Sequence, residues 1–399
     1  MKVIVVGAGL SGLVSAMRMQ EEGHRVVVLE ARERVGGRVL SLREGFRDGQ
    51  YADIGAEIIY RGQDRIVELV ERFGLTLTPH MSLGTDLPDL LMDGRRLDRG
   101  ETAEVVSELR ESYREHPPEP YESVAAWARR ARVGRWTYAL MEALVQSTPV
   151  TPLRLADARE FSPHLGWGHG YRKIAGGNDQ LPHRIAEGLD VRLGDPVRVV
   201  GWSGTGVTVE TDRENHRADR ALICVPGPLT TEIGFDPALP AEKVRALLAL
   251  RYGTGARLAV QYAEKDAVRG SMQAGAFTDR TPGWFFDQSM HQPGDAIVIS
   301  SVLGGDHEPS FDDPEPVLRE ADRTMQLVAG QPVTRTFGTV VSWTRDPWAR
   351  CLVRAPMGDQ RETVLPLVRA PLESRVFFAG EHTDDRVGPG GMEGAIRSA

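Results

Sequence analysis

The chain opens with two short apolar runs, each of which has the length and composition of a buried β-strand. Residues 2–6 read KVIVV and residues 25–29 read RVVVL. Apolar, β-branched runs of this length are typical of parallel strands that are covered on both faces. Residues 13–23, which lie between them, are predicted to form a helix. The order strand, helix, strand favours an α/β fold with a parallel sheet.

Two later stretches have different hydrophobic patterns. Residues 101–114 and 123–145 carry apolar residues at three- and four-residue spacings, which predicts helices, and Ser123 is the expected N-cap of the second. From about residue 251 to residue 343 apolar and polar positions alternate, as at 256–262 and 296–302. This alternation predicts strands of a mainly antiparallel sheet. A strand platform under a helical layer would close a pocket at the junction with the first region.

Three glycines connect the first strand to the first helix. Gly7, Gly9 and Gly12 form the spacing G-x-G-x-x-G. The first glycine of this motif makes a tight turn, the second lets the backbone approach a pyrophosphate, and the third packs the helix against the strand. Glu30 follows the second strand, 18 residues beyond Gly12, where an acidic side chain binds ribose hydroxyls. The arrangement predicts a dinucleotide site, and the acid favours FAD or NAD over NADP.

The amino-acid composition argues against several classes of binding partner. The 399 residues carry 48 basic and 56 acidic side chains, and the net charge of −8 argues against a nucleic-acid surface or a polybasic membrane anchor. Only Cys224 and Cys351 are present, which excludes a disulfide framework and a Cys-rich metal site and favours a cytoplasmic location. No run approaches the roughly 18 apolar residues of a membrane span. We therefore expect a small-molecule partner and no metal, nucleic acid or integral membrane association, and the oligomeric state, with a homodimer among the options, stays open.

A second glycine motif follows Glu30. Residues 30–39, EARERVGGRV, place Gly36, Gly37 and Arg38 where a Gly pair and an Arg continue a diphosphate cradle, and this segment resembles the flavin amine oxidase superfamily. The resemblance then continues in order along the chain, at 53–57 (DIGAE), 176–181 (GGNDQL), 195–197 (DPV), 221–226 (ALICVP), 378–383 (FAGEHT) and 391–396 (GMEGAI).

The resemblance implies a two-domain α/β fold that binds FAD. A Rossmann-like FAD-binding domain would comprise residues 1–62, 169–246 and 343–399, and a discontinuous α+β substrate-binding domain would comprise residues 63–168 and 247–342. His382 and Thr383 would lie beside the cofactor. The residues that the resemblance assigns to cofactor binding are Gly7, Gly9, Gly12, Glu30, Ala31, Arg32, Gly36, Gly37, Arg38, Ala56, Glu57, Val197, Trp343, Gly380, Glu381, Gly391 and Met392.

The sequence differs from the family in two features: the Cys that attaches the flavin covalently in some members, and the two Tyr that enclose the substrate amine in monoamine oxidases. Members with covalent flavin carry a Cys nine residues after a Trp. Here Cys351 lies eight residues and Leu352 nine residues after Trp343, so we expect noncovalent FAD. The two Tyr that enclose the amine in monoamine oxidases fall on Val353 and Gly391, which leaves room for a bulkier substrate.

The third departure is Arg257, which takes the place of a Lys that holds a water near the flavin in many members. Arg stays charged and suits a planar acceptor such as a carboxylate or an amide carbonyl. Glu57 occupies a position that faces the flavin in several members, where it would hold a substrate N–H or act as a base. Glu57 and Arg257 are therefore the candidate catalytic residues. The aromatic candidates for the pocket wall are Tyr60, Trp167, Tyr171, Trp284, Phe285 and Phe286.

The implied reaction is removal of hydride from a carbon next to nitrogen, which gives an imine, and H2O2 forms when O2 reoxidises the flavin. We expect a bulky amine, amino-acid derivative or amide as substrate. Of the 48 basic residues 44 are Arg, which is typical of GC-rich bacterial genomes and favours secondary metabolism such as antibiotic biosynthesis. Two alternatives stay open: an amide oxidase/cyclase whose imine is trapped to close a ring, and a flavin-binding interaction protein without turnover.

Overall fold

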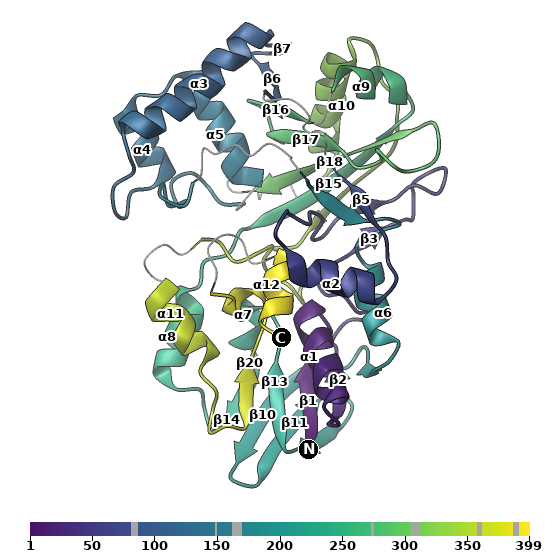
Figure 1. Ribbon diagram of the computed structural model, residues 1–399, viewed down its shortest axis with the longest axis vertical. Helices are drawn as coiled ribbons and strands as arrows, with labels where there is room; N and C mark the ends of the chain where they lie inside the picture. Colours follow the sequence, from purple (N-terminus) through teal and green to yellow (C-terminus); the bar gives the residue numbers. More distant parts are fainter. Residues whose placement is uncertain are drawn as a thin grey trace.

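The computed structural model describes residues 1–80, 87–147, 150–161, 170–272, 275–304, 312–356, 361–385 and 391–399. The chain forms two lobes, and both termini lie in the lower lobe of Figure 1. The upper lobe is built from segments that lie between residues 87 and 342, so the chain passes between the lobes more than once.

A five-stranded parallel sheet forms the centre of the lower lobe. Its order is β20-β13-β1-β2-β9, and every neighbouring pair runs parallel. The predicted strands at 2–6 and 25–29 are confirmed as β1 and β2. The first helix starts at Leu10 rather than at residue 13, because Gly9 already serves as its N-cap. The bounds are β1 Lys2–Val6, α1 Leu10–Glu21, β2 Arg25–Leu29, β9 Asp190–Arg192, β13 Arg220–Ile223 and β20 Val376–Phe378.

Helices cover one face of this sheet and a second sheet covers the other. Apolar residues of α1, α2, α6 and α12 form one buried cluster with β1 and β2. On the opposite face, the sheet β12-β11-β10-β14 packs Val200 and Val209 against Ile4 and Ile223. A parallel sheet covered on both sides is the architecture of a dinucleotide-binding domain. The bounds are α2 Asp64–Arg72, α6 Gln180–Ala186, β10 Val197–Ser203, β11 Gly206–Thr211, β12 Asn215–Ala218, β14 Gly234–Asp236 and α12 Gly391–Arg397.

A seven-stranded sheet with order β19-β15-β18-β17-β16-β6-β7 forms the upper lobe. The predicted antiparallel pairing is confirmed for β15 to β19, whereas β16 and β6 run parallel. Polar and apolar positions alternate along these strands, yet every residue of β15 and β18 is buried. The bounds are β6 Asp89–Met92, β7 Arg95–Arg96, β15 Gly255–Tyr262, β16 Ala276–Thr278, β17 Trp284–Asp287, β18 Ile297–Gly304 and β19 Arg335–Ser342.

The burial of the polar positions on β15 has a structural reason. One face of the sheet packs on α9 (Lys265–Ser271) and α10 (Glu315–Ala329). On the other face, Ala259 packs against Ala52 and Ile54, which belong to the segment around β4 (Ala52–Asp53) in the lower lobe. The polar residues of β15 therefore point into the junction between the lobes.

The helical layer of the upper lobe is close to the prediction. α3 (Arg99–Glu115) covers the predicted 101–114 helix and begins with a capping box of Asp98 and Glu101. Ser123 caps α4 as expected, since its Oγ accepts the Ala126 N–H at 3.2 Å. The single helix predicted over 123–145 is wrong. Arg132 adopts a left-handed φ of +57° and ends α4 (Val124–Ala131) before α5 (Arg135–Ser147) begins.

One of the two proposed domain boundaries coincides with the end of an element and the other falls inside a helix. β19 ends at Ser342, next to the boundary at 342, whereas α8 (Ala241–Ala249) continues past the boundary at 246. Leu247 and Leu250 are buried against Leu365 of α11 (Arg361–Arg369), which belongs to the lower lobe.

The remaining elements are β3 Ser41–Leu42, β4 Ala52–Asp53, β5 Leu77–Pro79, β8 Arg172–Ile174, α7 Gly227–Thr230 and a short 3-10 turn at Glu381–Thr383. In the described chain, no helix is both long and apolar enough to cross a bilayer.

Candidate active site

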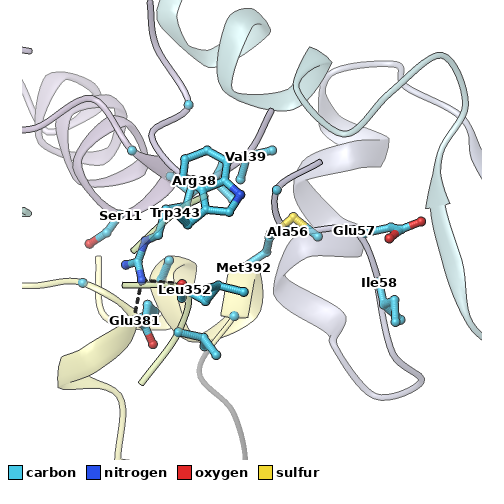
Figure 2. Close-up of a pocket in the computed structure, with 18 of the residues that line it drawn as sticks. Ser11, Arg38, Val39, Ala56, Glu57, Ile58, Trp343, Leu352, Glu381 and Met392 are labelled. Atoms are coloured by element: carbon cyan, nitrogen blue, oxygen red, sulfur yellow. Dashed lines mark hydrogen bonds and ion pairs between the residues drawn. The ribbon is translucent and has the colours of Figure 1, made fainter. Parts of the chain in front are cut away.

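A pocket lies where the two lobes meet. It encloses about 1330 Å³ of space, including the part open to solvent, and both lobes contribute to its wall. Figure 2 shows Arg38, Trp343 and Leu352 gathered at one end, with Glu57 and Ile58 beyond Ala56 at the other. The predicted cofactor residues that line this pocket are Gly9, Gly36, Arg38, Ala56, Glu57, Trp343, Gly380, Glu381, Gly391 and Met392.

The glycine turn before α1 has the geometry that a dinucleotide requires. Gly7 adopts a left-handed φ of +102°. A Cβ on Gly12 would lie 2.0 Å from the Gly7 carbonyl oxygen, so only glycine allows this packing. A Cβ on Gly9, by contrast, would meet no protein atom within 4 Å, and Gly9 faces the pocket. The open space at Gly9, beside the N-terminus of α1, fits a pyrophosphate.

Glu30 is tied into the same turn. Its carboxylate accepts the backbone N–H groups of Ala8 at 2.7 Å and Arg32 at 2.9 Å. Burial raises the pKa of Glu30 above its usual value, although these two N–H groups oppose the shift. Arg32 pairs with Asp346, with Nη1 2.8 Å from Oδ2. Contact with FAD stays a prediction for every residue assigned to the cofactor, and the assigned residues that do not line the pocket are Gly7, Gly12, Glu30, Ala31, Arg32, Gly37 and Val197.

Arg38 joins the second glycine motif to the C-terminal motif. Its Nη1 donates to Glu381 Oε1 at 3.0 Å and to the Leu352 carbonyl oxygen at 2.7 Å (Figure 2). The same nitrogen lies 3.4 Å from Cys351 Sγ. Cys351 is fully buried, and burial raises the pKa of its thiol to about 11. Leu352 lines the pocket and Cys351 does not, so the thiol faces Arg38 rather than the cofactor space.

Acid precipitation of the purified protein is expected to release FAD into the supernatant. The reason is that Leu352 lines the pocket at the position that aligns with the flavin-attached Cys of other members, and its side chain has no nucleophilic group. Absorbance of the supernatant and the mass of the Cys351 peptide check the result. Flavin that stays with the pellet, on a peptide heavier by one flavin, would contradict it.

Glu57 and Arg257, the two predicted catalytic residues, form a buried ion pair at the pocket wall. Arg257 Nη2 donates to Glu57 Oε2, and also to the Asp53 carbonyl oxygen at 3.4 Å. The side chains are 1% and 8% exposed, respectively. Arg257 Nε is buried without a hydrogen-bond partner in the described part of the chain. The sequence suggested two separate substrate contacts, whereas the structure places the two side chains against each other.

His80 is a member of this site that the sequence did not indicate. Its Nε2 lies 2.9 Å from Glu57 Oε1, and both side chains are 1% exposed. Burial alone would raise the pKa of Glu57, but Arg257 and His80 hold it below its usual value, so Glu57 is ionised at neutral pH. A second buried pair, Asp53 and Lys173 at 3.6 Å, lies next to it.

Of the aromatic residues proposed for the pocket wall, some line the pocket and others lie in the buried cores. Tyr60 and Trp284 line the pocket, and Tyr171 packs edge-on against Tyr60 with ring centroids 5.2 Å apart. Phe285 and Phe286 belong to the buried cores. Trp167 lies outside the described residues.

His382 and Thr383 lie in the short turn after Gly380. Burial, together with the nearby cations Arg38 and Arg354, lowers the pKa of His382 to about 3, so it is neutral where it lines the pocket. Thr383 Oγ1 donates to the Gly380 carbonyl oxygen at 2.9 Å.

The two positions of the missing Tyr cage both line the pocket. Val353 contributes a small apolar side chain, and a Cβ on Gly391 would meet no protein atom within 4 Å. Ile58, Val150 and Val302 add to this apolar wall. The space next to the charged group of Glu57 and Arg257 therefore suits an apolar substrate body.

Comparisons with known proteins give the same class of protein that the sequence motifs predicted, a flavin amine oxidase. The chain matches the family described as flavin containing amine oxidoreductase over residues 10–161 and 155–399. It is 24% identical to the L-amino-acid oxidase of Vipera ammodytes ammodytes, over 97% of this chain and 89% of that protein. It is 26% identical to the L-amino acid dehydrogenase of a Synechocystis strain, over 75% and 72% of the respective chains. The structure of cyclohexylamine oxidase from Brevibacterium oxydans superimposes with a TM-score of 0.83 at 20% identity, covering 100% of this chain and 96% of that one.

The protein is thus a two-domain flavoprotein of the α/β class, with a Rossmann-like cofactor domain. It belongs to the flavin-containing amine oxidoreductases and is an FAD-dependent enzyme of that family. When bound, FAD supplies a two-electron acceptor for a C–H bond next to nitrogen. The open space at Gly9 and the pocket lined by the C-terminal motif fit this cofactor.

Proposed function

We propose that the protein oxidises a bulky amine whose nitrogen lies close to a carboxylate or amide carbonyl. The observation that carries the proposal is Arg257, a cation in the pocket wall that uses Nη2 for Glu57 while its Nε has no hydrogen-bond partner among the described residues. A guanidinium with donors left over suits a planar oxygen acceptor. Relatives named L-amino-acid oxidase and L-amino acid dehydrogenase support this, since an amino acid carries such an acceptor.

The electron acceptor and the fate of the product complete the proposal. One relative is named an oxidase and another a dehydrogenase, so membership of the family leaves the acceptor open. We infer O2 as acceptor and H2O2 as by-product, with an imine that is released and hydrolysed. Trapping of the imine to close a ring is the second candidate, favoured by the room that Val353 and Gly391 leave. The Arg-rich composition favours bacterial secondary metabolism, and the two free cysteines favour the cytoplasm.

Arg257→Met is expected to raise KM for L-phenylalanine about ten- to hundredfold, because a charge-assisted hydrogen bond of about 1.5–3 kcal/mol is lost. KM for cyclohexylamine, which has no acceptor, should change far less. Steady-state kinetics with both compounds, together with FAD content, measure the split. Arg269→Met is the matched control, since Arg269 pairs with Asp287 in the same lobe but outside the pocket. Equal effects on both substrates would contradict the proposed role of Arg257.

A further inference from the structure

His80 reaches Glu57 from the end of a strand, and among the described residues neither β5 nor His80 itself lines the pocket. It directly follows β5, and its backbone N–H donates to the Tyr171 carbonyl oxygen at 2.9 Å, which fixes the strand end. The Phe286 ring lies edge-on to the imidazole at 5.8 Å, and the Arg257 guanidinium lies over the same ring at 5.6 Å. Phe286 thus packs against both partners of Glu57 and limits how far either can move.

Each oxygen of the Glu57 carboxylate has a polar side chain beside it among the described residues. Arg257 donates a hydrogen bond to Oε2, whereas His80 Nε2 lies 2.9 Å from Oε1 without hydrogen-bond geometry. A carboxylate oxygen has two acceptor directions, so at least one direction at each oxygen is left. Glu57 lines the pocket, and Figure 2 shows its side chain beyond Ala56, away from the Arg38 end.

The charges around this carboxylate come from four elements or strand ends. Arg257 on β15, His80 after β5 and Lys173 on β8 stabilise the ionised form, and the buried carboxylate of Asp53 on β4 opposes it. Lys173 is held by Asp53 at 3.6 Å and by the Gln288 carbonyl oxygen at 2.9 Å, so it acts on Glu57 only at a distance. Removing His80 therefore takes away one of the two direct contacts of the carboxylate group.

We propose that His80 is a positioning residue that fixes the Glu57 carboxylate at the pocket wall as the hydrogen-bond acceptor for the substrate N–H group. Its catalytic consequence rests on the proposed function, whereas its effect on Glu57 does not. A carboxylate that is contacted closely at both oxygens keeps its free acceptor directions in one place, and a carboxylate contacted at one oxygen can rotate.

The test compares two variants of the FAD-loaded enzyme. His80→Leu removes the donor, and His80→Gln keeps an N–H donor near the position of Nε2. His216→Gln is the matched control, because His216 is also buried beside a carboxylate, 4.0 Å from Asp195, but lies on β12, outside the lining of the pocket. The first readout is the pH dependence of anaerobic flavin reduction by L-phenylalanine and by cyclohexylamine. The second is the protonation midpoint of Glu57, from infrared difference spectra between each protein and its Glu57→Gln counterpart.

His80→Leu is expected to slow flavin reduction about tenfold and to raise the Glu57 midpoint by about one pH unit, since a close polar contact that favours the charged form is lost. His80→Gln should restore both values most of the way, and His216→Gln should change neither. An unchanged midpoint in His80→Leu would overturn the proposal, as would loss of FAD from that variant with the midpoint unchanged. If neither compound reduces the wild-type flavin, the proposed function fails, and the infrared midpoint still decides whether His80 holds Glu57.

Discussion

The Gly9→Val variant is expected to fold and to purify without FAD. A side chain at this position meets no protein atom within 4 Å, so the fold tolerates it, but it occupies the space where the pyrophosphate must approach the start of α1. Gly9 has an ordinary backbone conformation, with φ −73°, so Val adds no left-handed strain. Flavin absorbance per protein and circular dichroism give the two readouts.

Gly188→Val is the matched control for this variant. Gly188 also has open space around its Cβ position, and it is exposed after α6, away from the pocket. This control should keep its flavin. Full flavin occupancy in Gly9→Val would refute the dinucleotide interpretation of the turn, and unfolding of Gly9→Val would show that the space at Gly9 is filled by protein.

Glu57→Gln is expected to slow anaerobic flavin reduction about ten- to hundredfold, because a charged acceptor for the substrate nitrogen becomes neutral. The same change should destabilise the fold by on the order of 3 kcal/mol, since it leaves Arg257 as a buried cation without its carboxylate. Stopped-flow reduction and urea unfolding measure the two effects. Glu101→Gln on α3, which removes the carboxylate that pairs with Arg95 of β7, is the control and should leave reduction unchanged.

The stability cost of Glu57→Gln has a defined pH dependence. The folded protein holds the pKa of Glu57 below its usual 4.5, so the stabilisation is present above that value and is lost as pH falls through the folded pKa. The difference in unfolding free energy between wild type and Glu57→Gln should therefore be constant near neutrality and shrink in acid. A difference that grows as pH falls below 4.5 would contradict the assignment of Glu57 as the ionised partner of Arg257.

Local sequence patterns were sufficient for the cofactor end of the site. Gly7, Gly9 and Gly12 lie between a buried strand and a helix, and the backbone requirements of each are visible in the G-x-G-x-x-G spacing. The C-terminal motif was equally informative, because Gly380 and Glu381 occur in a contiguous pattern and line the pocket. Strands β1 and β2 were predicted to the residue, since their apolar runs end at glycine or charged positions.

The substrate end could not be predicted in the same way, because its contacts join segments that are distant in sequence. Glu57 contacts Arg257, which lies 200 residues further along the chain. The sequence around either residue gives no indication of this contact. His80 lies in a stretch without a motif, and it follows β5, whose pairing with β8 places it beside Glu57. The alternation on β15 indicated a strand correctly but left open that its polar face is buried against the other lobe.

The proposed substrate class is tested most directly by anaerobic mixing of the FAD-loaded protein with L-phenylalanine, L-leucine, cyclohexylamine and benzylamine, followed by admission of air. The flavin absorbance is expected to bleach fastest with an amine that carries a carboxylate, because Arg257 has donors available for it, and air is expected to restore the absorbance with formation of H2O2. Faster bleaching by benzylamine than by either amino acid would contradict the proposed role of Arg257. No bleaching by any of the four amines would contradict the proposed substrate class as a whole and favour a flavin-binding protein without turnover.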